Sequence, residues 1–163
     1  MRDSTMGRMN KARPQAPNRP SPDDPYQFLH EEIAALAIEQ GLDVFVFAAE
    51  GRLIGASLGC HTQTIEQIAA SSSGLVNGAR GYGDRAQIGG VERLVTRYAG
   101  GALVLLPVNE VIWAGCLAEL GRVSDTAHTL SLFTERIMSL VPSEVGLSLP
   151  AVALTDAGNG ARR

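Results

Sequence analysis

The sequence contains few residues that could cross-link the fold or hold a metal ion. Its 163 residues include two cysteines, Cys60 and Cys116, which offer neither a disulfide framework nor a metal-ligand spacing. Cys60 precedes His61, but no further residue completes a metal site or a nucleophile with its base, so we interpret the pair as a loop before a helix. His30 and His128 have no carboxylate three or four positions further along their predicted helices. We expect no metal site.

Lysine is almost absent, and this excludes one class of nucleotide-binding protein. A phosphate-binding P-loop requires a lysine after its glycines, but the single lysine is Lys11, near the N-terminus. The glycines around Tyr82 lack the third glycine and the preceding strand of a dinucleotide-binding motif. The serines at 71–73 lie within a predicted helix and do not form a nucleophile elbow. We therefore expect no cofactor and no enzymatic activity.

Long hydrophobic runs are also missing. The longest, Ala102 to Val108, has the length of a strand and is far short of the ~20 apolar residues that cross a bilayer. The N-terminal segment carries charges and prolines and has no apolar core of a secretory signal. We expect a cytoplasmic protein with no membrane insertion.

The net charge of −3 is unevenly distributed along the chain. Residues 1–22 carry five cations against Asp3 and contain four prolines, which predicts a disordered Pro/Arg-rich leader. Residues 23–141 carry seven arginines against fourteen acidic residues and form the predicted domain. An acidic domain argues against nucleic acid as a partner. Residues 142–163 have no sustained period and are predicted to be a flexible C-terminal tail.

Hydrophobic periodicity predicts an α+β domain with the order helix, two strands, helix, three strands, helix (αββαβββα). The sheet is expected to have five strands, to be mostly antiparallel, and to carry helices on both faces. Thr64 and Gln67 fit a capping box for the second helix. The predicted elements are a helix begun by Asp24 and Pro25 and closed by Gly41, strands 44–49 and 52–57, a helix from Thr64 ended by Gly78, Gly81 and Gly83, strands 91–98, 102–108 and 111–120, and a helix capped by Ser124 or Asp125 and stopped by Pro142.

Strands 44–49, 102–108 and 111–118 are apolar on both faces, so both faces of the sheet require cover. The first and last helices can cover one face, which leaves only the helix at 64–80 for the other. That helix carries a ridge of small residues, which permits close approach of a second helix. We predict a twofold dimer whose interface includes Ala70, Ser73, Gly74, Asn77 and Gly78. The alternative is that these residues pack under a loop of the same chain.

Four arginines cluster in sequence on this otherwise acidic domain. Arg80, Arg85, Arg93 and Arg97 lie within eighteen positions and are offset only by Asp84 and Glu92. Because the guanidinium group suits carboxylates and phosphates, the cluster suggests a partner-docking surface near the dimer seam. The alternative is a solvated strand edge, where charge prevents aggregation of sheets.

These features together resemble a roadblock/LC7 domain, in particular the bacterial members found near small Ras-like GTPases. The resemblance covers residues 26–141, and its main segments are the hairpin at 45–57, the helix at 68–81, the strand at 101–108 and the Gly121-Arg122-Val123 segment. It implies a roadblock/profilin-like fold and a homodimer in which the second helices pair and the third strands can join two sheets into one. It also implies a non-catalytic module that binds and modulates a small Ras-like GTPase in bacterial signalling.

A small-molecule sensor of the profilin, GAF or PAS type is the alternative function. A sensor requires an internal cavity with a few polar groups. The strand interiors are instead filled by Phe45, Phe47, Leu105 and Trp113. This favours the scaffold over the sensor. A purely structural assembly subunit is a third possibility.

Overall fold

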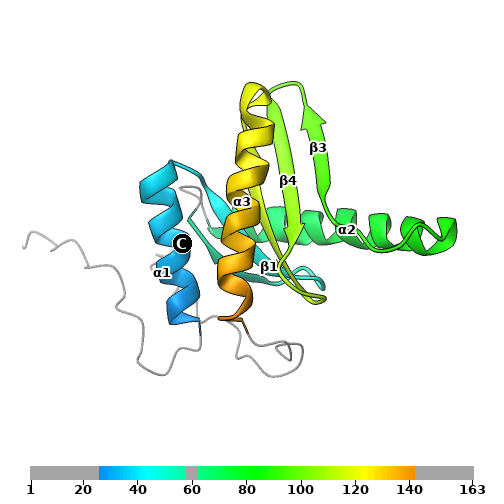
Figure 1. Ribbon diagram of the computed structural model, residues 1–163, viewed down its shortest axis with the longest axis horizontal. Coiled ribbons are helices and arrows are strands. Elements are labelled where there is room, and N and C mark those ends of the chain that lie inside the picture. Colours follow the sequence, from blue (N-terminus) through cyan, green and yellow to red (C-terminus); the bar gives the residue numbers. More distant parts are fainter. Residues whose placement is uncertain (1–25, 58–61, 142–163) are drawn as a thin grey trace, which may run out of the picture.

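The computed structural model describes residues 26–57 and 62–141, and the predicted order of elements is confirmed there (Figure 1). The leader, the tail, the Asp24-Pro25 helix start and the Cys60-His61 pair lie outside the described residues. The elements are α1 (Gln27–Gln40), β1 (Val44–Ala48), β2 (Leu53–Ala56), α2 (Thr62–Ala86), β3 (Leu94–Tyr98), β4 (Gly101–Pro107), β5 (Ile112–Ala118), a 3₁₀ turn (Leu120–Arg122) and α3 (Val123–Met138).

The five strands form one sheet in the order β2-β1-β5-β4-β3. Each of these pairings is antiparallel, so the predicted, mostly antiparallel α+β sheet is confirmed. The three central strands are the ones that are apolar on both faces, and they are almost completely buried. β2 and β3 are the first and last strands in this order.

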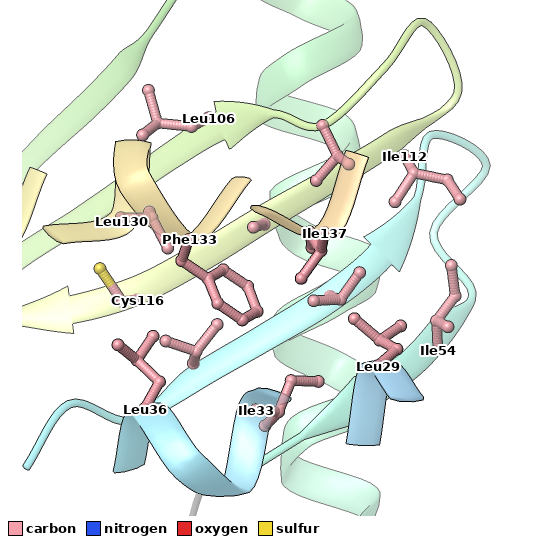
Figure 2. Packing of buried hydrophobic residues seen from close by; sticks show 14 of the residues in the cluster. Leu29, Ile33, Leu36, Ile54, Leu106, Ile112, Cys116, Leu130, Phe133 and Ile137 are labelled. Carbon is pink, nitrogen blue, oxygen red and sulfur yellow. The ribbon is translucent and has the colours of Figure 1, made fainter. Parts of the chain in front are cut away.

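Helices cover both faces of the sheet, in the division expected from the sequence (Figure 1). α1 and α3 lie on one face, and Figure 2 shows Leu29 and Ile33 of α1 and Phe133 of α3 pointing into the same apolar cluster. An ion pair between Glu32 and Arg136, 3.1 Å apart, joins the two helices. α2 alone packs on the other face. No helix of the described residues is both long enough and apolar enough to cross a membrane.

The boundaries of α2 differ from those predicted. The helix begins at Thr62, so Thr64 lies inside its first turn and is not the cap, and it continues through the glycines to Ala86. The expected end at 78–83 was wrong because Gly83 is buried against the returning chain. A Cβ at this position would collide with the carbonyl oxygen of Gly89. Tertiary packing here outweighs the poor helix propensity of glycine.

Ser73 and Asn77 fasten α2 to the turn between β1 and β2. The Ser73 hydroxyl donates to the Ala49 carbonyl oxygen at 2.5 Å, and the Asn77 amide donates to the same oxygen at 3.0 Å. Asn77 also donates to the Ser73 hydroxyl at 3.3 Å. One carbonyl oxygen of the hairpin therefore accepts two side-chain donors from consecutive turns of α2.

Cys116 lies at the centre of the sheet, on β5, and is fully buried. Burial disfavours the charged thiolate and raises the pKa of the thiol from 9.0 to about 12. The side chain thus acts as a small apolar residue of the core.

We predict that Ser73→Ala and Asn77→Ala each lower the free energy of unfolding by about 1 kcal/mol. The double variant should lose more than the sum, because only then does the Ala49 oxygen lack a side-chain donor. Urea denaturation of the four proteins measures this coupling. Strict additivity would show that the two donors act independently.

We predict that the protein loses stability as the pH rises from about 9 toward about 12, the interval between the unfolded and folded pKa values of Cys116. Over this interval the unfolded thiol ionises while the folded thiol stays neutral, so the contribution falls by about 1.4 kcal/mol per pH unit. The measurement is urea denaturation of a Cys60→Ser protein with and without Cys116→Ala. Equal slopes against pH in the two proteins would contradict the prediction.

Candidate self-association surface

An apolar groove lies between α2 and the β3 side of the sheet. β3 pairs with β4 in a register that turns Leu94, Thr96 and Tyr98 toward the face covered by α2. α2 does not cover them fully, and a groove of about 310 Å³ remains. Its apolar lining is formed by Ile68, Leu75, Tyr98, Leu103 and Leu117.

Three of these side chains are exposed although they are large and apolar. Leu75 is 39% exposed, Leu117 is 50% exposed and Tyr98 is 55% exposed. They come from α2, β5 and β3, which the fold brings to one groove. A contiguous apolar surface of this kind, bordered by polar residues, is typical of an interaction site.

The groove is adjacent to an open sheet edge. β3 pairs with β4 on one side, and none of the described strands pairs with its other side. Figure 1 shows α2 crossing the strands, with its C-terminal part reaching past β3 in this view. An open edge presents unpaired backbone N–H and C=O groups to any further strand.

The small residues predicted to form the dimer interface divide into two groups. Gly74 and Gly78 face open space, since a Cβ on either would meet no atom within 4 Å, and Ala70 is exposed. Ser73 is 5% exposed, and both it and Asn77 are bonded to the hairpin of their own chain. Packing within the chain thus accounts for Ser73 and Asn77, whereas no described residue lies within 4 Å of a Cβ placed on either glycine.

Two of the four arginines predicted to form a docking surface contact other segments of the chain. Arg80 donates to the Glu110 carbonyl oxygen at 2.6 Å, and its guanidinium carbon lies 5.2 Å from the centre of the Trp113 ring. Arg97 donates to the Leu120 carbonyl oxygen at 3.4 Å, and its neighbours Thr96 and Tyr98 point to the opposite face of the sheet. Arg85 and Arg93 are exposed. Arg80 therefore holds the Glu110 turn and Trp113 in place.

Sequence reasoning missed the apolar lining of the groove. The alternation of Leu94, Thr96 and Tyr98 was visible in the sequence, but their incomplete cover depends on where α2 crosses the sheet. Leu117 gave a weak signal, as a large apolar residue near the end of a strand. In residues 26–57 and 62–141 no cluster of three His, Cys, Asp or Glu residues could hold a metal ion.

Comparison with known proteins gives matches at the level of structure alone. No family model and no curated protein matches the sequence. Solved structures do match. A roadblock/LC7 domain from Streptomyces avermitilis has a TM-score of 0.61 at 16% identity, over 68% of this chain and 94% of that one. MglB from Myxococcus xanthus has a TM-score of 0.64 at 11% identity, over 71% and 95%.

A third structure, described as MglB with a tetrameric arrangement, has a TM-score of 0.64 at 9% identity, over 72% of this chain and 90% of that one. These identities are low, but the matches cover nearly the whole of each neighbour. The three helices and the five-stranded antiparallel sheet of this chain make up an α+β fold that matches these neighbours. The chain therefore has the roadblock/LC7 fold.

Proposed function

We propose that the protein is a homodimeric, non-catalytic regulatory module. This proposal is supported by three neighbouring features that the described residues leave uncovered. They are the exposed glycines of α2, the apolar groove and the β3 edge, which has no further described strand beside it. Each is a surface that a second protein could complete. The tetrameric arrangement described for a structural neighbour supports self-association of this fold.

A twofold axis beside β3 would complete all three features at once. Antiparallel pairing of two β3 edges would join two five-stranded sheets into one. Because α2 lies on the same face of each sheet, the two α2 helices would then be neighbours across the axis. Gly74 and Gly78 would allow their backbones to approach closely, and the grooves would be covered.

We further propose that the dimer binds and modulates a small Ras-like GTPase in the cytoplasm of a bacterium. The support is the fold together with the arginines near β3 on an otherwise acidic domain. Arg80 is partly buried between the Glu110 turn and Trp113, so we assign partner recognition to the exposed Arg85, Arg93 and Arg97. Arg97 remains exposed although it donates to the Leu120 carbonyl oxygen. Arginine favours such a surface because its planar fork can bind carboxylate and phosphate groups.

The sensor alternative receives less support from the packing. Phe45, Phe47, Leu105 and Trp113 are at most 1% exposed and fill the space between α2 and the sheet. A hollow of about 620 Å³ beside β2 is an open groove at the sheet edge and does not lie inside the fold. We therefore rank the interaction module above the sensor.

We predict that the wild type sediments at about twice its 17.2 kDa chain mass and that Gly74→Leu/Gly78→Leu sediments as a monomer. Leucine is the better helix former by about 1 kcal/mol per site, so the variant protomer should remain folded. The control is Ser124→Leu, which adds an exposed leucine on the opposite face of the sheet. A monomeric wild type would refute the dimer, and an unchanged mass of the glycine variant would refute the placement of Gly74 and Gly78 in its interface.

We predict that Arg93→Glu/Arg97→Glu lowers affinity for a purified Ras-like GTPase of the source bacterium by at least about tenfold, because it places like charges against an acidic partner surface. Titration calorimetry with GDP-loaded and GTP-analogue-loaded GTPase measures the effect. Arg52→Glu, at the distant β2 edge, is the control. Equal affinity of the wild type and the double variant would remove these arginines from the proposal.

A further inference from the structure

The end of α2 buries no side chain against the sheet. Val76 is the last residue of the helix in the core on this face, and after it only Gly83 is buried, against the backbone of Gly89 in the returning chain. Figure 1 shows the C-terminal part of α2 reaching past β3 in this view. We call residues 81–90 the arm. It carries Tyr82, whose side chain is 67% exposed.

The apolar groove and Tyr82 lie along the same flank of α2. Four residues are spaced at i, i+4, i+7 and i+11, which places them on one side of the helix: Ser71, Leu75, Gly78 and Tyr82. Ser71 and Leu75 line the groove of about 310 Å³. Gly78 adds no side chain to this flank. The flank thus has a hollow in the first half of α2, a smooth stretch in the middle and a projecting tyrosine in the second half.

A twofold axis beside β3 brings the arm of one copy to the groove of the other. α2 crosses the sheet near the β4–β5 turn, since Arg80 contacts Glu110 and Trp113 there. The groove lies on the other side of α2, toward Tyr98 at the opposite end of the strands. When two β3 edges pair antiparallel, the arm of the partner passes over β3 on this open side. The two α2 helices then run antiparallel, and position 82 of each faces the first half of the other.

We propose that Tyr82 of each protomer occupies the apolar groove of its partner. The contact rests on the homodimer proposed above and supplies the side chain that fills each groove. Leu75, Leu103 and Leu117 form apolar walls, and none of the described residues that line the groove is charged. An uncharged aromatic ring with a hydroxyl at its tip suits such a lining.

Ser72 gives the groove an unused hydrogen-bonding group. It lines the groove but is only 1% exposed, and its hydroxyl has no hydrogen-bond partner among the described residues. Its neighbour Ser73, by contrast, donates to the Ala49 carbonyl oxygen. A buried hydroxyl without a partner is unfavourable. Rotation about χ1 turns the Ser72 hydroxyl into the groove, where it can form a hydrogen bond with the phenol of the partner's Tyr82.

Disulfide trapping tests this placement. In a Cys60→Ser background, Ser71→Cys/Tyr82→Cys should form an intermolecular disulfide on mild oxidation and migrate as a covalent dimer on a non-reducing gel. The two positions are about 16 Å apart along one helix, so no disulfide can join them within a chain. Glu66→Cys/Tyr82→Cys is the matched control and should remain uncrosslinked, because Glu66 lines the groove on the opposite flank of α2.

Sedimentation equilibrium measures the contribution of the contact to dimerisation. We expect Tyr82→Ala to raise the dissociation constant of the dimer at least about tenfold. Phe28→Ala, which removes a similarly exposed ring from α1 on the other face of the sheet, should leave it unchanged. Tyr82→Phe and Ser72→Ala should each raise it about fivefold, and the two together no further, since both remove the same hydrogen bond.

The two measurements separate this contact from the dimer itself. A wild type that dimerises would overturn the contact, and leave the dimer intact, if Ser71→Cys/Tyr82→Cys gave no more crosslink than the control. The same holds if Tyr82→Ala kept the dissociation constant of the wild type. A monomeric wild type would overturn both the contact and the dimer.

Discussion

The structure depends on a sheet that is apolar on both faces and has only three helices to cover it. β1, β4 and β5 are buried on both sides, so each exposed area of either face has a large cost in free energy. α1 and α3 cover one face as a pair, joined by Glu32 and Arg136. α2 must cover the other face alone. The apolar groove beside β3 is what α2 leaves open.

The two sides of α2 have different roles. Toward the sheet it buries Ile65, Ala69 and Val76, and it is fastened to the hairpin by Ser73 and Asn77. Away from the sheet it exposes Gly74 and Gly78, which weaken an isolated helix by about 1 kcal/mol each. The helix is stable because tertiary contacts along its inner side exceed this cost. Its outer side can then remain smooth enough for another helix.

The two edges of the sheet, β2 and β3, each border a groove on the surface. β3 borders the groove and the glycines of α2, which fits a second copy of the same surface. β2 borders a groove that is also lined by residues of α1 and α2. The interior between α2 and the sheet is filled by aromatic and aliphatic side chains. Interactions at the periphery are therefore favoured over binding inside the fold.

The sequence by itself determined the order of the elements and the division of helices between the faces. Strand and helix periods and the double-sided apolar strands are local patterns, and local sterics and burial enforce them. It did not determine the end of α2, because the contact of Gly83 with the chain at Gly89 is made only after folding. It also did not separate the roles of Ser73 and Asn77 from those of Gly74 and Gly78.

The contacts that the arginines make within the chain were likewise not visible in the sequence. Arg80, Arg85, Arg93 and Arg97 are close in sequence, and this suggested one surface. The tertiary structure directs Arg80 to Trp113 and Arg97 to Leu120. Adjacent residues of a strand point to opposite faces, and the carbonyl groups that arginines bind come from distant segments. The spacing of apolar residues along the sequence therefore determined which helices and strands form. The packing of these elements decided which side chains contact one another.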